Sequence, residues 1–315
     1  MAETSKRRQK KERVYRSFVW QKPLPAKKTS LQSPLKLWLE SFKFCRRNLR
    51  PFAVLAVGFF IAALVLLFSG GGNESLIAIR DEFSQRYGAG FAGEVSTSLA
   101  MLSESVNALV NRLTQSFGWF VILNLFAGLS VLWLIRNLYR PDRGRKVKIR
   151  EAVYFGPAQL VPFAALGLLL LLQLLPSLIV ADFGAQLREN GVLQTNLEQA
   201  AAVAVILSFV ALSFYWLAGG VFSLIIVSLP GAKPFDAWQT ALHLVHRRRL
   251  PAAGRLFLFG AGATLAVCLL ALPVGRLLPQ WSEHFIYLAS SCFFVVGHIY
   301  CFLLYQDLLT AKTLN

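Results

Sequence analysis

Residues 229–249 read LPGAKPFDAWQTALHLVHRRR and lie between two long apolar stretches. Pro230 and Gly231 predict a turn at the start of this segment. Pro234 suits the first position of a helix, where the N–H that proline lacks would have no helical partner. Apolar residues then recur at helical spacing, and three arginines follow just before the next apolar stretch. The segment therefore predicts a short basic amphipathic helix that leads into an apolar one.

Six apolar stretches of the chain contain no Asp, Glu, Lys or Arg. They cover residues 51–73, 113–135, 152–181, 199–232, 256–275 and 285–306. Each stretch is at least as long as the ~20 residues that a helix needs to cross the ~30 Å of hydrocarbon in a bilayer. Helices satisfy their own backbone hydrogen bonds in lipid, and these stretches lack the polar–apolar alternation of a membrane barrel strand. We therefore predict an all-α fold, a polytopic membrane helix bundle with six transmembrane helices.

The predicted spans cover residues 51–70, 117–136, 160–181, 201–229, 256–275 and 285–306. The fourth apolar stretch is too long for a simple perpendicular span, so either tilt or a break at Gly219-Gly220 absorbs the excess. Close helix packing is the other interpretation of these two glycines. Thr195 and Glu198 have the spacing of a capping box at the start of this helix.

The net charge of +17 is distributed unevenly between the predicted loops. Residues 1–50 hold 15 Lys/Arg against 3 Asp/Glu, residues 136–151 hold 7 against 2, and residues 233–255 hold 5 against 1. The loops between them are not positive, since residues 74–112 hold 3 against 5 and residues 182–198 hold 1 against 3. This alternation follows the positive-inside rule. It predicts a multi-pass protein of the cytoplasmic membrane with both termini in the cytoplasm.

Two domains are predicted from these patterns. Residues 1–33 form a basic, disordered cytoplasmic tail, and residues 34–315 form the transmembrane domain with an outer helical segment at 74–116. The tail is expected to contact anionic lipid, at ~1 kcal/mol for each positive charge near the membrane. Binding of nucleic acid by the tail is the disfavoured alternative, and we expect no nucleic-acid partner.

The amphipathic helix at 234–249 has an earlier counterpart at 34–51. A shift of 200 residues places Pro34 on Pro234, Trp38 on Trp238, Arg47 on Arg247 and Pro51 on Pro251. In the earlier copy Leu35, Trp38, Leu39, Phe42 and Cys45 form the apolar stripe, and Lys36, Glu40, Lys43 and Arg47 form the polar stripe. Such a helix either lies in the membrane interface or packs under the bundle.

A fainter copy follows from a shift of 111 residues. It matches Glu40 with Glu151, Phe44 with Phe155, Leu49 with Leu160, and Pro51-Phe52 with Pro162-Phe163. Each copy precedes a pair of spans. We predict three parallel repeats, each with a cytoplasmic amphipathic helix and a transmembrane hairpin.

The segment PFDAWQTALHLVHRRR, after a long span that ends in LPG, resembles bacterial six-helix integral membrane proteins. That group includes the membrane domain associated with glycerophosphodiester phosphodiesterases. The resemblance covers residues 150–310 best. It implies the six-helix architecture and no phosphodiesterase activity, because the catalytic barrel has no counterpart in this chain.

Few polar side chains fall inside the predicted spans. The candidate intramembrane contacts are Asn124, Gln173 and His298. Intramembrane ionisable groups are functional candidates by default. His298 is either a proton relay or ligand contact, or a neutral histidine hydrogen-bonded between helices, and the second interpretation is favoured. Asp307 ends the same span, where we expect it to be hydrated.

No recognisable catalytic or metal-binding set accompanies these residues. His243 and His246 share one helix but lack further metal ligands at a suitable spacing. No nucleophile motif or phosphate-binding loop occurs in the right context. We therefore expect no metal site, no catalytic residues, no cofactor and no enzymatic activity.

Six arginines next to the spans are candidate contacts for anionic lipid headgroups on the cytoplasmic side. They are Arg46, Arg47, Arg50, Arg247, Arg248 and Arg249. We expect a structural, lipid-interacting or partner-binding membrane protein, with an unidentified membrane protein as a further partner left open. The alternative is a transporter or permease component for an uncharged or amphipathic solute. A membrane-embedded enzyme is the third and least favoured hypothesis.

Overall fold

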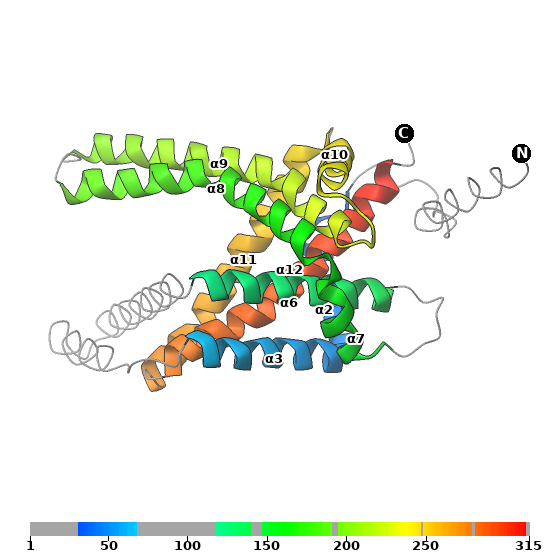
Figure 1. Ribbon diagram of the computed structural model, residues 1–315. Coiled ribbons are helices and arrows are strands. Elements are labelled where there is room, and N and C mark those ends of the chain that lie inside the picture. The colour runs from blue at the N-terminus through cyan, green and yellow to red at the C-terminus, as the bar shows by residue number, and fades with distance from the viewer. Residues whose placement is uncertain are drawn as a thin grey trace, which may run out of the picture.

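The computed structural model describes residues 31–67, 117–139, 147–190, 195–246, 248–278 and 281–312 (Figure 1). In chain order its elements are α2 (Pro34–Arg47), α3 (Leu49–Leu67), α6 (Phe117–Tyr139), α7 (Ile149–Phe155), η2 (Gly156–Gln159), α8 (Leu160–Glu189), α9 (Asn196–Val227), α10 (Pro234–Val245), α11 (Arg249–Leu277) and α12 (Ser282–Lys312). All of these elements are helical, so the predicted all-α class is confirmed. The predicted outer segment 74–116 and residues 1–30 of the predicted tail lie outside the described residues.

Five of the described helical segments are long and apolar enough to cross a membrane. They are Gly118–Tyr139, Ile149–Gly184, Leu197–Val227, Arg249–Val274 and His284–Thr310. A sixth is reached if α2 and α3 count as one span, but the chain bends by 91° between them. This is the architecture of a helical membrane bundle. Several helices run past the predicted spans, because a helix does not end where the charge-free stretch ends: α11 already begins at Arg249.

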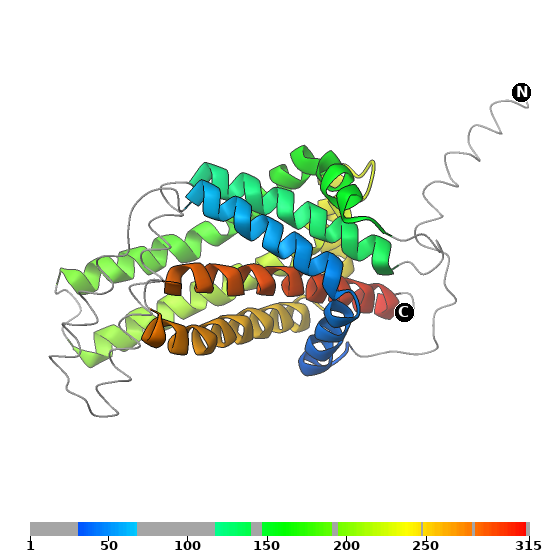
Figure 2. The same cartoon turned by 90° about the horizontal axis from the view of Figure 1, so that it is seen from below.

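The long helices form three antiparallel hairpins: α3 with α6, α8 with α9, and α11 with α12. The second helix of each hairpin contacts the first helix of the next, so that α6 meets α8, α9 meets α11, and α12 meets α3. Figure 2 shows α3, α6 and α12 lying side by side from below, with α2 standing across the end of the bundle. The three hairpins therefore pack in a closed cycle.

The short helices follow the same cycle. α2 packs on α11 and α12, α7 and η2 pack on α3 and α6, and α10 packs on α8 and α9. Each short helix leads into one hairpin of the cycle. It packs on the hairpin that comes before that one in the cycle. We call the end of the bundle at which α2, α7 and α10 gather the basic end, because the arginine-rich segments of the chain lie there.

α2 does not present the single apolar stripe that its sequence predicts. Leu37 and Ser41 are buried against the bundle, and Trp38 packs on Phe259 of α11 with ring centroids 5.2 Å apart. Leu35 and Leu39 are exposed. The helix therefore has three faces. One apolar face packs on the bundle, a second apolar face is exposed, and the third face is the polar stripe. Helical periodicity alone does not separate two adjacent apolar faces.

α9 runs without interruption through Gly219 and Gly220, so the predicted break there is wrong. The alternative of close packing holds: a Cβ on Gly220 would collide with the Leu170 side chain of α8, and one on Gly219 would lie 2.9 Å from Leu242 of α10.

The predicted capping box at the start of α9 is confirmed, since Thr195 Oγ1 accepts from the Glu198 N–H at 3.2 Å and Glu198 Oε2 accepts from the Thr195 N–H at 3.0 Å.

The excess length of α9 lies at its basic end. From Leu197 to Leu217 most residues are exposed, and from Ala218 to Val227 nearly all are buried. The exposed part has the length of one membrane crossing, ~30 Å. The buried part continues beneath α10, which covers it.

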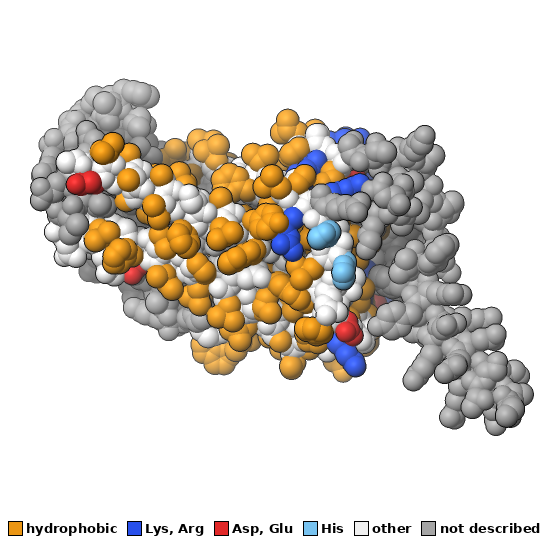
Figure 3. Space-filling model, turned by 90° about the horizontal axis from the view of Figure 1, so that it is seen from above, with side chains coloured by type: hydrophobic (Ala, Val, Ile, Leu, Met, Phe, Trp, Pro, Cys, Tyr) orange, Lys and Arg blue, Asp and Glu red, His pale blue; other side chains and the backbone are white. Residues whose placement is uncertain are grey.

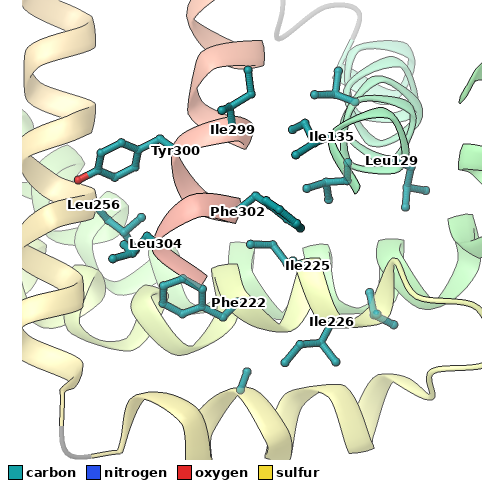
Figure 4. Close-up of a cluster of buried hydrophobic side chains, with 14 of the residues drawn as sticks. Leu129, Ile135, Phe222, Ile225, Ile226, Leu256, Ile299, Tyr300, Phe302 and Leu304 are labelled. Atoms are coloured by element: carbon teal, nitrogen blue, oxygen red, sulfur yellow. The ribbon is translucent and has the colours of Figure 1, made fainter. Parts of the chain in front are cut away.

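A core of apolar side chains fills the bundle at the basic end (Figure 4). Phe302 of α12 and Ile225 of α9 lie on the side of Ile135 of α6, whereas Leu304 of α12 lies beside Leu256 of α11, and all of these side chains are buried. Tyr300 of α12 stacks on Phe259 with ring centroids 4.6 Å apart. The second helices of all three hairpins therefore meet in one apolar cluster.

We predict that Gly156→Ala destabilises the protein by about 1–3 kcal/mol. A Cβ at this position would lie 2.8 Å from the Ser130 Cα, so η2 must move away from the α6 backbone. Thermal unfolding in a fixed detergent measures the loss. Gly254→Ala is the matched control, because a Cβ there meets nothing within 4 Å. Equal melting temperatures for the two variants would contradict this packing.

Candidate functional site

The basic end carries basic side chains next to a largely apolar surface. Figure 3 shows the face formed by α8, α9 and α10, which is hydrophobic over most of its length, with Lys, Arg and His side chains gathered at one end. His243 and His246 of α10 are exposed there. Within the described residues no three His, Cys, Asp or Glu side chains lie close enough to hold a metal ion.

The six arginines predicted to contact lipid differ in their surroundings. Arg46, Arg47 and Arg50 are exposed, and Arg247 lies outside the described residues. Arg248 and Arg249 are half-buried at the start of α11. The sequence alone does not distinguish exposed arginine side chains from half-buried ones.

Arg249 is positioned by an aromatic ring of the neighbouring hairpin. Its guanidinium carbon lies 5.0 Å from the centroid of the Tyr215 ring of α9, which is a cation–π distance. In the part of the chain that the structure describes, two buried donor atoms, Arg248 Nη1 and Arg249 Nε, have no hydrogen-bond partner. Unpaired buried donors are costly, so this pair of arginines stands out as a candidate anion site.

Another half-buried arginine of the same helix is fully engaged. Arg255 Nε donates to the Gln32 carbonyl at 2.9 Å, Nη2 to the Leu31 carbonyl at 3.3 Å, and Nη1 to the Pro251 carbonyl at 2.9 Å. The Gln32 N–H in turn donates to Asp307 Oδ2 at 2.7 Å. Main chain ahead of α2 is thus held between α11 and α12. Asp307 is buried, so the expectation that it is hydrated is wrong.

The three predicted intramembrane contacts lie on different helices, α6, α8 and α12. Asn124 Nδ2 donates to the Phe120 carbonyl at 2.8 Å, and His298 Nδ1 lies 2.8 Å from the Phe294 carbonyl. A carbonyl only accepts, so Nδ1 carries the proton in this contact. Both bonds remain within one helix, which corrects the prediction that His298 bonds between helices. Its Nε2 faces α6, 3.1 Å from where a Cβ of Gly128 would lie.

Gln173 occupies a different environment, inside the α8–α9 hairpin. Its Oε1 is buried without a hydrogen-bond partner, 3.4 Å from where a Cβ of Gly220 would lie. Ser213 Oγ of α9 is also buried without a partner. The hairpin therefore encloses two polar oxygens, of which the sequence pointed only to Gln173.

Sequence reasoning missed the roles of Arg255, Asp307 and Tyr215. Gln32 and Asp307 are 275 residues apart, and no local spacing connects them. Tyr215 had a weaker signal, since a tyrosine near the end of a span commonly lies at the membrane interface.

Comparison of the chain with protein-family models, with curated proteins and with solved structures found no match in any of the three. The resemblance to bacterial six-helix membrane proteins therefore stays a prediction.

We predict that Asp307→Ala speeds amide hydrogen exchange at Gln32 by at least ~10-fold, because the N–H loses a charge-assisted hydrogen bond to a buried carboxylate. Hydrogen exchange with mass spectrometry measures the effect on the peptide that contains Gln32. Asp182→Ala is the control, because Asp182 is an exposed carboxylate that accepts from Gln186 of its own helix. Unchanged protection of Gln32 in the Asp307 variant would show that this hydrogen bond does not hold the main chain ahead of α2.

Proposed function

We propose that this protein is a structural, lipid-interacting component of the cytoplasmic membrane, with both termini in the cytoplasm and without enzymatic activity. The observation that carries the proposal is the apolar core at the basic end, surrounded by basic amphipathic helices. The sequence adds that positive charge alternates between loops, and that no recognisable nucleophile–base or metal set accompanies the spans.

The core supports a structural role because it leaves little room for a polar path. Leu129, Ile299 and Leu304 come from α6 and α12 and are all fully buried at the centre of the basic end. A solute or ion that crossed the bundle there would have to displace close-packed apolar side chains. The polar groups nearby, Asp307 and Arg255, bond to main chain of the protein itself.

We further propose that the bundle consists of three repeated units arranged in a cycle. The spans after the short helices begin at Leu49, Leu160 and Arg249, which differ by the same 111 and 200 residues as the sequence copies. The helix faces agree as well: Ser41, Ala152 and Ala241 occupy one equivalent position and each is 0% exposed. Small residues at helix contacts in membranes let the backbones approach closely.

A transporter for an uncharged or amphipathic solute remains the second candidate. The observation in its favour is the pair of unpaired polar oxygens, Gln173 Oε1 and Ser213 Oγ, inside the α8–α9 hairpin. A solute with a hydroxyl or amide donor matches these acceptors chemically. The two candidates differ in whether water reaches the centre of the bundle.

We expect Ile299→Cys and Leu304→Cys to resist a small charged thiol reagent added to membranes, because both side chains lie in the apolar core. The four native cysteines, Cys45, Cys268, Cys292 and Cys301, are first replaced. Lys36→Cys is the control and should react fully, since Lys36 is exposed on α2. Rapid modification of either core position would reveal a hydrated path and favour the transporter.

A reporter that is active only in the cytoplasm should be active when fused after Asn315. The reason is the excess of Lys and Arg in the segments on the same side as the termini. The same reporter inserted in the acidic loop between α8 and α9 should be inactive. Activity in the loop and not at the C-terminus would reverse the proposed orientation.

A further inference from the structure

We propose that the start of α11 binds the phosphate of an anionic phospholipid, with Arg248 and Arg249 as donors and the acyl chains along the exposed apolar surface beside Tyr215. This inference rests on the proposed function, because it needs the basic end to lie at a membrane surface. It assigns a defined lipid site to two of the six arginines that the sequence offered as general lipid contacts.

Two guanidinium N–H donors at the start of α11 are unpaired among the described residues. Arg248 Nη1 and Arg249 Nε are buried from solvent and have no hydrogen-bond partner among the described residues. The fold is able to satisfy a guanidinium group when it serves structure alone, as the three carbonyl acceptors of Arg255 show. Two adjacent arginines with unused buried N–H groups are therefore suited to an acceptor that the chain does not supply. Arginine donors match phosphate oxygens in geometry and charge.

The local charge selects an anion. The first turn of α11 contains no acidic residue, and Arg248 at its N-cap makes no side-chain capping bond. A helix N-terminus adds positive potential to that of the two guanidinium groups. The only acid of α10, Asp236, lies in the first turn of that helix, away from the end at which α11 begins. No neutralising carboxylate is therefore provided by either helix at their junction.

The position of the site selects a lipid rather than a free anion. Tyr215 lies three residues before Ala218, the point at which α9 changes from exposed to buried. The exposed part of α9 ends here after the length of one bilayer crossing, so Arg249 lies at the level of the lipid headgroups. Leu212, Tyr215 and Trp216 share one side of α9 and are all exposed. They form an apolar wall beside the guanidinium groups, on which acyl chains can lie.

Aromatic residues of this kind commonly occupy the bilayer interface. The cation–π contact with Tyr215 also holds Arg249 in place before any lipid binds. A preorganised guanidinium group loses less conformational entropy on binding than one on a free surface side chain. Arg46 and Arg47, which are exposed, have no such support in the described contacts.

The test uses the full chain purified in detergent and titrated with phosphatidylglycerol, phosphatidylethanolamine or inorganic phosphate. Native mass spectrometry measures the bound lipid, and thermal unfolding measures stabilisation. Arg248→Met/Arg249→Met removes the donors and keeps an unbranched side chain that replaces the aliphatic part of each arginine. Arg46→Met/Arg47→Met removes the same charge from the exposed end of α2 and is the matched control.

We expect one phosphatidylglycerol to bind the native chain, and to bind the Arg248/Arg249 variant at least ~10-fold more weakly. The control should keep native affinity. Without lipid, the Arg248/Arg249 variant should melt no lower than the native chain, because it loses two unpaired buried donors. A variant that merely misfolds would melt lower, which would count against a ligand site.

Three other results would overturn the proposal. Equal weakening in both double variants would indicate diffuse charge attraction. Equal stabilisation by inorganic phosphate would indicate a site for free phosphate, and equal binding of phosphatidylethanolamine would remove the requirement for an anionic lipid. The proposed function fails on a different observation, the reaction of cysteines in the core, so the two failures can be told apart.

Discussion

The close contact between each short helix and the neighbouring hairpin determines the geometry of the basic end. The equivalent residues Ser41, Ala152 and Ala241 are small and fully buried, so their helices come near the backbone of the spans. At Gly156 the approach is closer still, because no side chain at all fits against the α6 backbone at Ser130. In lipid, apolar side chains gain little by leaving one apolar surrounding for another, so such backbone-level packing provides much of the association energy.

This packing explains why the chain bends where it does. α2 rests on the last hairpin and does not continue straight into its own span, because it meets α3 at 91°. The bends place α2 and α10 across the ends of spans, with their polar faces directed away from the bundle. Main chain leading into α2 is then fixed by Arg255 and Asp307, which join it to α11 and α12. The N-terminal part of the chain is thereby joined to the last hairpin.

Much of this fold could be predicted from sequence, because membrane constraints act on composition. Charge-free stretches located the long helices, and the capping box located the start of α9. The faces of α2 could not be predicted, since Leu37 and Leu39 are equally apolar while only Leu37 is buried. The sequence offered the arginines before α11 as candidate lipid contacts, and that remains a prediction. The contact of Arg249 with Tyr215 could not be predicted, because it depends on how two hairpins pack. Contacts such as that of Gln32 with Asp307 depend on the whole fold and have no local signal.

The length of α9 connects the fold to the membrane surface. A helix of 32 residues exceeds one perpendicular crossing, and it contains no break at Gly219-Gly220. Its last ten residues are mostly buried beneath α10 and the neighbouring spans. The change from exposed to buried residues along α9 falls beside Tyr215, whose ring lies 5.0 Å from the guanidinium carbon of Arg249. On the lipid site proposed above, a phosphate at this point would satisfy the donors of Arg248 and Arg249 that the described residues leave unpaired, and would offset their cost to the fold.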